Sequence, residues 1–450
     1  MFFLFHLLLA QLDREADLFG AQPESKSTES AAAPASTQAS TSLSDSMQIG
    51  GRLQYSLGTS LLENQIFYEG SATNQKQADI YFDTRPNKNL RSFLRFRLSE
   101  SSNKSDRNTQ EKSSESSSSV VTSLDELWVK SDIDNGVFFT FGRQHLKWGS
   151  GRFWNPTDFT APLQKDPFAI FDNRLGQDLI KIHIPQEKNG NNYYLVLQFD
   201  RMKRNQDMGI AARGEWSVIG NGELALSVQA RSKAPIHFGV DYSGAVGPID
   251  MHIESATSSR SSSLVYSGKI DPIAGTLPTG KENKNSWKTT ALLGFESTIK
   301  YNDDDNLNIG VETLYNQAGY LERDLEMYSL VTNQTQYLYS GRNYVGAYVR
   351  ISNPGSWNKT TFILNGISNL SDNTSVARVT GSWNFLQNLN LQADVGRCFG
   401  DAGELCFRIP PSYAALLNAP QIKPEQKALL VMWPTKRILF TAGLALSLNF

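Results

Sequence analysis

The 450-residue sequence predicts an all-β protein: a transmembrane antiparallel up-and-down β-barrel of about 18 strands, with about 16 as the alternative. Three observations predict it. Apolar and polar residues alternate in many segments, short and long connections follow one another regularly, and the last segment is an alternating strand that ends on an aromatic residue. Runs of about 18 apolar residues are absent from the sequence, which excludes a helical membrane protein. A barrel needs an apolar residue only at every second position of a strand.

The alternation is cleanest in the last segment, 437–450. Leu444, Leu446 and Leu448 lie on one face of this predicted strand, whereas the other face is small and mixed. A strand of roughly 9 to 11 tilted residues crosses the apolar layer of a membrane, so the segment is long enough. We therefore expect it to close the barrel by pairing with the first strand, 47–58.

One interior strand predicts a charged lining. In 90–99, three arginines alternate with large apolar residues, and the preceding strand carries two aspartates on the same side. Three arginines on one face need water, which favours a field across a water-filled lumen. An internal ion-pair network that plugs the lumen is the alternative. The charged lining residues are Asp79, Asp83, Arg91, Arg95 and Arg97.

The connections between the predicted strands alternate in length. A membrane barrel has short turns on the periplasmic side and longer loops outside, whereas a sandwich or a propeller has no reason for this rhythm. Both termini on the periplasmic side require an even number of strands. The short connections are 85–89, 132–136, 186–191, 220–221, 243–247, 301–306, 353–358 and 386–388, and the long ones are 59–75, 100–119, 146–175, 255–287, 316–341 and 397–436.

The N-terminal part of the chain predicts export. Residues 2–10 form an apolar run that suits the core of a signal peptide but is too short to span a membrane, although no basic residue precedes it. An N-terminal strand or helix of the folded domain is the alternative. We predict a signal peptide in 1–21, a disordered leader rich in Ser, Thr and Ala in 22–46, and the barrel in 47–450.

The sequence contains two cysteines, Cys398 and Cys406, which flank the loop FGDAGEL. In an exported chain this spacing favours a small loop closed by a disulfide over a metal site, which would need further ligands nearby. Two unpaired thiols are the alternative.

The third long connection, with the strand that leads into it, reads FGRQHLKWGSGRFWNPTDFT over 141–160. Its glycines permit close approach of the backbone, and Asn-Pro followed by Asp favours a tight turn. If this loop folds inward, its charges and aromatic faces would line a constriction. Packing of the aromatic residues against the barrel rim is the alternative. The candidates are Lys147, Trp148, Arg152, Trp154, Asp158, Lys165, Asp166 and Arg174.

The elements GRQ at 142–144, WGSG at 148–151 and NPTD at 155–158 resemble a signature of porin-like outer-membrane families, including carbohydrate- or alginate-export-type barrels and related porins. The C-terminal Phe450 likewise resembles the end of Gram-negative outer-membrane barrels. The resemblance implies location in the bacterial outer membrane, contact with lipid and lipopolysaccharide, and recognition by the barrel-assembly machinery. It also implies that the loop after the fifth strand folds into the lumen, and it is compatible with a homo-oligomer.

Charge and motifs exclude other classes of function. The formal net charge of −2 argues against nucleic-acid binding. The histidines are scattered, and the sequence has no HExxH, phosphate-binding or nucleophile-elbow motif, so we predict no enzyme, no catalytic residue, no cofactor and no metal site. The predicted function is passive diffusion of small hydrophilic solutes through a porin or a substrate-selective channel. The first alternative is a closed barrel with an adhesive or structural surface role, and the second is a secreted carbohydrate-binding β-protein.

Overall fold

The computed structural model describes fourteen stretches of the chain. The predicted signal peptide and leader lie outside them. None of the helices in these stretches is long and apolar enough to cross a membrane. The described residues are 47–63, 70–104, 120–134, 136–161, 167–168, 174–200, 207–218, 222–232, 234–270, 278–302, 305–332, 334–400, 403–406 and 438–450.

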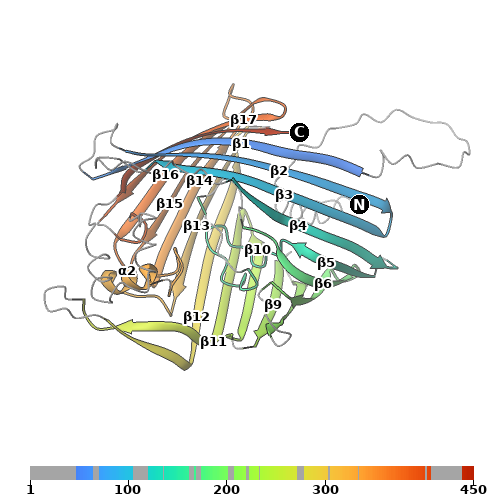
Figure 1. Ribbon diagram of the computed structural model, residues 1–450, viewed down its shortest axis with the longest axis horizontal. Helices are drawn as coiled ribbons and strands as arrows, with labels where there is room; N and C mark the ends of the chain where they lie inside the picture. The colour runs from blue at the N-terminus through green and yellow to red at the C-terminus, as the bar shows by residue number, and fades with distance from the viewer. Residues whose placement is uncertain are drawn as a thin grey trace, which may run out of the picture.

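Eighteen antiparallel strands form one sheet in which each strand pairs with its neighbours in sequence, and β1 pairs with β18 to close the barrel (Figure 1). This confirms the predicted fold class and the strand number of 18. The strands are β1 (Met47–Leu62), β2 (Ser71–Asn87), β3 (Leu90–Lys104), β4 (Val120–Ile133), β5 (Val137–Gln144), β6 (Gln177–Gln186), β7 (Asn191–Gln198), β8 (Gly209–Val218), β9 (Gly222–Arg231), β10 (His237–Val246), β11 (Ile249–Ser267), β12 (Thr279–Lys300), β13 (Asn306–Asn316), β14 (Asn343–Ser352), β15 (Thr360–Asn369), β16 (Thr374–Leu386), β17 (Leu389–Phe399) and β18 (Ile438–Asn449).

Short and long connections alternate along most of the chain, with the short β15–β16 connection as an exception, and two of the predicted long loops are largely strand. β11 and β12 extend through much of 255–287, and β1 and β2 extend through much of 59–75. The sequence hides these extensions because they are rich in Ser, Thr, Asn and Gln, so the apolar alternation ends while the backbone pairing continues. The structure also has a helix that was not predicted, α2 (Arg323–Val331), in the connection between β13 and β14.

The outer face of the barrel is apolar. On β13, Val311 and Tyr315 are 43% and 44% exposed, whereas Glu312 and Leu314 between them are buried and point inward. Large aromatic residues are exposed near the short turns and again towards the long connections, as in barrels whose aromatic belts meet the two membrane interfaces. These residues are Tyr301, Trp357 and Trp383 near the turns and Trp287, Tyr315 and Phe399 at the other end.

The closing strand has the predicted faces and the predicted partner. Leu446 is exposed on the outside of β18, whereas Ala445 and Ser447 are buried. β18 pairs with β1 over most of its length, and the C-terminal Phe450 exchanges two backbone hydrogen bonds with Gly51, at 2.8 and 3.0 Å. The seam is therefore a backbone ladder with one irregularity, between Leu61 and Leu62.

Candidate functional site

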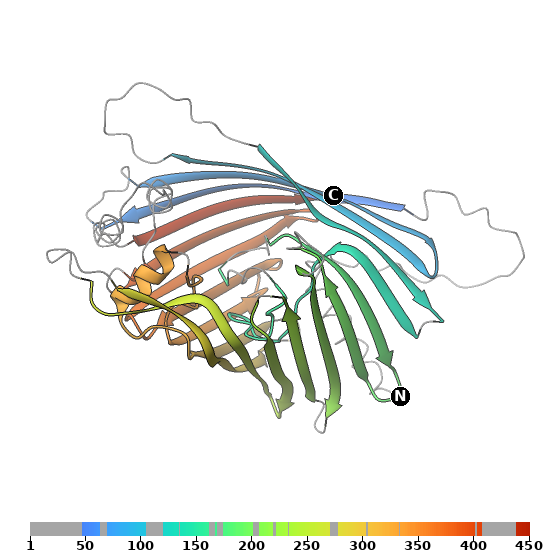
Figure 2. The same cartoon turned by 60° about the horizontal axis from the view of Figure 1, so that its bottom comes forward.

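The connection between β5 and β6 enters the barrel (Figures 1 and 2). We call residues 145–161 the inserted segment. Its backbone is hydrogen-bonded to two inward-facing carboxylates, Glu254 on β11 and Glu312 on β13. Since β5 is far from β11 and β13 in the strand order, the segment crosses the interior and reaches the opposite wall.

Glu254 is completely buried and fully bonded. Its Oε1 accepts the N–H groups of Ser150 and Gly151, each at 2.7 Å, and its Oε2 accepts the N–H and hydroxyl of Thr157 at 3.2 and 2.8 Å. Such charge-assisted bonds stabilise a carboxylate away from water. Gly149, with φ of 82°, is required here because a Cβ would lie 2.7 Å from both Glu254 oxygens.

Glu312 binds the next residues of the inserted segment. Its two oxygens accept the N–H groups of Arg152 and Phe153 at 2.5 and 2.8 Å. His252 Nε2 lies 2.9 Å from Glu312 Oε1. Among the described residues, His252, Glu296 and Glu312 form one set whose ligand atoms lie close enough together to hold a metal ion.

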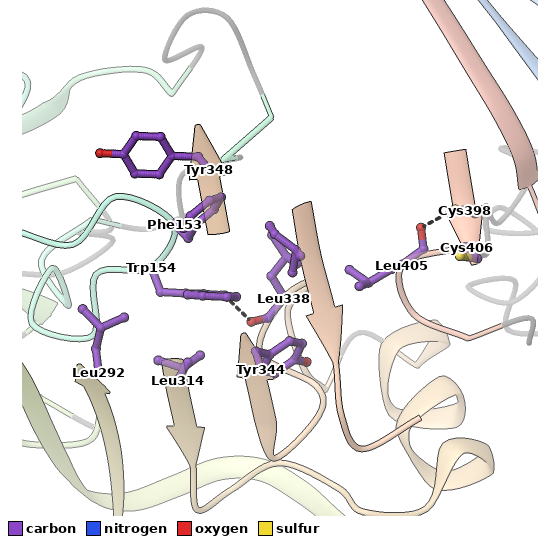
Figure 3. Packing of buried hydrophobic residues seen from close by; sticks show 11 residues of the cluster. Phe153, Trp154, Leu292, Leu314, Leu338, Tyr344, Tyr348, Cys398, Leu405 and Cys406 are labelled. Carbon is purple, nitrogen blue, oxygen red and sulfur yellow. Dashed lines mark hydrogen bonds between the residues drawn. The ribbon is translucent and has the colours of Figure 1, made fainter. Parts of the chain in front are cut away.

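Aromatic packing completes the anchorage. Trp154 is 1% exposed and donates its indole N–H to the carbonyl oxygen of Leu338 at 3.2 Å (Figure 3). Phe153 and Trp154 belong to a cluster with Leu314 and Tyr344 on β13 and β14. The burial of two aromatic side chains fixes this end of the segment against the wall.

Asp158 connects two parts of the inserted segment to each other and also binds Arg174, which precedes β6. Its carboxylate accepts the N–H of Trp148 and a guanidinium N–H of Arg174, both at 3.2 Å. Burial raises the pKa of Asp158 to about 6, against the attraction of Arg174. Asp158 and Arg174 thus hold the shape of the connection and do not face open space.

The five constriction candidates of the segment therefore have different surroundings. Trp148, Trp154 and Asp158 are buried, so the two indole rings pack against the barrel interior. The Arg152 guanidinium lies 3.9 Å from the centre of the Tyr348 ring, and Lys147 is exposed. Of the three candidates beyond the segment, Arg174 binds Asp158, whereas Lys165 and Asp166 lie outside the described residues.

The predicted charged lining is present on β2, β3 and β4 as ion pairs between neighbouring strands. Arg91 binds both oxygens of Asp83, at 3.0 and 2.9 Å. Arg97 bridges Asp79 at 3.0 Å and Asp125 at 2.9 Å. These charges form ion pairs along the wall between neighbouring strands.

A β-bulge extends this network. Arg95 pairs with Glu126 in the β3–β4 ladder and the next pair is Phe96 with Leu124, so Asp125 is an extra residue. Both Asp125 and Glu126 are therefore buried on the inner side, and Glu126 lies 3.2 Å from Arg95. Arg52 of β1 adds an ion pair to Asp79 at 2.6 Å. We define Arg52, Asp79, Asp83, Arg91, Arg95, Arg97, Asp125 and Glu126 as the ion-pair wall.

Sequence reasoning missed three of the residues that define the site: Glu254, Asp125 and His252. Glu254 lies 104 positions from Ser150 in the sequence, so no local motif connects it to the segment that it binds. The adjacent acids Asp125 and Glu126 break the period-two pattern of β4, and that break is the signal of a bulge that could have been used.

The two cysteines are buried free thiols in the structure. Cys398 and Cys406 are hydrogen-bonded to each other through their side chains, and this bond lowers the pKa of Cys406. Cys406 also lies 3.5 Å from the carbonyl oxygens of Ser375 and Phe399. The disulfide between them stays a prediction.

Comparisons with known proteins concern the fold. No protein-family model matches the sequence, and no curated protein is similar to it in sequence. OccK8 (OprE) of Pseudomonas aeruginosa is similar in structure with a TM-score of 0.52 at 9% identity, over 90% of this chain and 98% of that chain. OccK1 (OpdK) of Pseudomonas aeruginosa has a TM-score of 0.51 at 8% identity, over 91% of this chain and 99% of that chain.

The architecture defines the class. A closed 18-stranded antiparallel barrel with an apolar outer face is the fold of outer-membrane porins, and these structural neighbours share it. The chain therefore has the closed antiparallel barrel fold of these structural neighbours.

Proposed function

We propose that the barrel is a channel for passive diffusion of small hydrophilic solutes, and that the inserted segment narrows its lumen. The observation that carries the proposal is the anchorage of the segment on Glu254 and Glu312. Two buried carboxylates on the far wall hold backbone N–H groups of a loop that starts at β5. A segment fixed in this way restricts the opening permanently, as a constriction in a porin must.

The passage is proposed to lie between the inserted segment and the ion-pair wall. The β5–β6 connection touches the ion-pair wall where it begins, since His145 Nε2 lies 3.0 Å from Asp125 Oδ1. Its further contacts extend from β8 to β16: the Arg213 guanidinium lies over the Trp148 ring, Phe159 stacks on His237, and Arg378 donates a hydrogen bond to the carbonyl oxygen of Phe168. The other residues of the ion-pair wall lie on β1–β4, outside these contacts. On the segment, Lys147 is the exposed cation nearest to its start.

The charge pairing of the wall suggests the class of solute. Each arginine of the ion-pair wall has a carboxylate within 3.2 Å, and the four arginines face four carboxylates. Such a lining offers donors and acceptors of both signs at little net charge. We therefore propose weak ion selectivity and passage of polar solutes irrespective of their net charge.

Planar-bilayer recording tests the function. Purified, heat-modifiable protein should give discrete conductance steps, and deletion of 148–158 should increase them. An absence of steps from correctly folded protein would favour the closed barrel with an adhesive or structural surface role. Unchanged conductance after the deletion, with intact folding, would keep the channel but remove the constriction.

We propose that the apolar outer face contacts lipid and lipopolysaccharide, that the C-terminal strand is read by the barrel-assembly machinery, and that the protein has no enzymatic activity. Assembly into a homo-oligomer is compatible with this arrangement. Chemical cross-linking of intact cells would detect the oligomer.

A further inference from the structure

On the inner wall, residues from β11, β12 and β13 lie side by side, one from each strand, and the middle residue is a glycine. His252 pairs with Gly294 in the β11–β12 ladder, and Gly294 pairs with Glu312 in the β12–β13 ladder. The imidazole of His252 lies across Gly294, so that a Cβ at position 294 would collide with it. The glycine therefore lets a histidine and a glutamate from two non-adjacent strands meet.

A third ligating side chain completes the group. Glu296 follows Gly294 by two residues and lies on the same inner face of β12. One nitrogen of His252 and one oxygen from each of Glu296 and Glu312 lie within 4.8 Å of one another. His252 and Glu312 are buried, whereas Glu296 is half-buried, so one side of the group is open to further ligands such as water.

The donor atoms of the three side chains indicate which metal ions fit. One imidazole nitrogen with two carboxylate oxygens suits Zn²⁺ and the other divalent first-row transition ions, whereas Ca²⁺ takes six or more oxygen ligands. The 2.9 Å between His252 Nε2 and Glu312 Oε1 is a hydrogen-bond distance. It is also close to the separation of two ligands that each lie roughly 2.0–2.2 Å from one ion.

We propose that His252, Glu296 and Glu312 form a binding site for a divalent first-row transition-metal ion such as Zn²⁺. The ion replaces the proton between His252 and Glu312 and leaves the two N–H bonds from Arg152 and Phe153 to Glu312 in place. The site thereby joins the wall to the inserted segment. It stands on the geometry of three strands and does not depend on channel function.

Calorimetric titration of Zn²⁺ into the purified full chain in detergent tests the site, after treatment with a chelator and without a histidine tag. One ion should bind per chain. His252→Asn should weaken binding about 100-fold or more, since even partners outside a ligand set change metal affinity by roughly 10- to 100-fold. Glu296→Gln should weaken zinc binding as well. Because this variant leaves the anchorage on Glu312 intact, it tests the site even if His252→Asn fails to fold.

The matched control is His237→Asn, because His237 also faces inward on a neighbouring strand but stacks on Phe159 outside the ligand set. This control should retain full affinity. X-ray absorption at the zinc edge should show one imidazole among the ligands. Absence of one-to-one binding, or equal affinity of the wild-type protein and both ligand variants, would overturn the proposal.

Discussion

Glu254 holds Thr157 through both its backbone and its side chain: the N–H and the hydroxyl of Thr157 donate to the same carboxylate oxygen, at 3.2 and 2.8 Å. Glu254 lies on β11, whereas Thr157 belongs to the connection between β5 and β6. The hydroxyl bond favours Thr or Ser at this position, because a β-branched apolar residue would remove one of the two donors to this buried oxygen.

Release of the inserted segment should follow from Glu254→Gln combined with Glu312→Gln. An amide cannot accept four hydrogen bonds, and each buried N–H left without an acceptor costs about 1–3 kcal/mol. Trypsin should then cut the folded barrel after Arg152, whose backbone is held in the wild-type protein. Glu296→Gln removes one inward-facing charge without touching the anchorage and should remain protected. Equal protection of the double variant would show that aromatic packing alone fixes the segment.

Ion selectivity should respond to the ion-pair wall. Asp83→Asn removes the carboxylate that binds Arg91 at two atoms, so a guanidinium charge is left uncompensated towards the lumen. The reversal potential in a KCl gradient near 0.1 M should shift towards anion selectivity, and the shift should shrink at 1 M as screening increases. Asp134→Asn, at the exposed β4–β5 turn, is the control. A shift of the same size in this control would contradict a role of the wall.

Stability should depend on pH through Glu326 of α2. Ser340 Oγ lies 2.8 Å from Glu326 Oε1 and 2.5 Å from Glu404 Oε1, and one hydroxyl hydrogen cannot serve two ionised carboxylates. Burial, with repulsion from Glu404, raises the pKa of Glu326 to about 9. The folded protein therefore keeps a proton that the unfolded chain loses above its ordinary pKa of 4.5.

Unfolding free energy should consequently fall as pH rises from about 4.5 to about 9, by at most about 1.4 kcal/mol per pH unit. Glu326→Gln should reduce this fall, which thermal unfolding at pH 5 and pH 8.5 would measure. Glu322→Gln, on the exposed residue that precedes α2, should behave as the wild-type protein does. Identical pH dependence of the Glu326 variant and the wild-type protein would exclude the shared proton.

The cysteines give a separate prediction. The thiols of Cys398 and Cys406 are in contact, so an oxidising compartment should join them. When the protein is isolated in the presence of an alkylating agent, its intact mass should be two hydrogens below the mass of the chain with two free thiols. Alkylation should occur only after reduction. Alkylation of both cysteines without reduction would identify them as lasting thiols.

The fold could be predicted from the sequence because one face of each strand is apolar where it meets lipid. The period-two alternation of Leu446 and the other outward residues indicates the membrane face. The number of strands was predicted from the positions of the turns. The inner face is different, because a lumen accepts both charged and apolar residues. Arg91 and Asp83 could be placed on that face, but whether they pair depends on register. Glu254 and Ser150 are far apart in the sequence and meet only once the barrel is closed, so their hydrogen bond could not be predicted from the sequence.

Single-channel recording in planar bilayers tests the central claim most directly, with the wild-type protein compared with Glu254→Gln combined with Glu312→Gln. A porin-type channel narrowed by the inserted segment predicts discrete steps from the wild-type protein and larger or noisier steps from the double variant. Folded, heat-modifiable protein that gives no steps in either form would contradict the account.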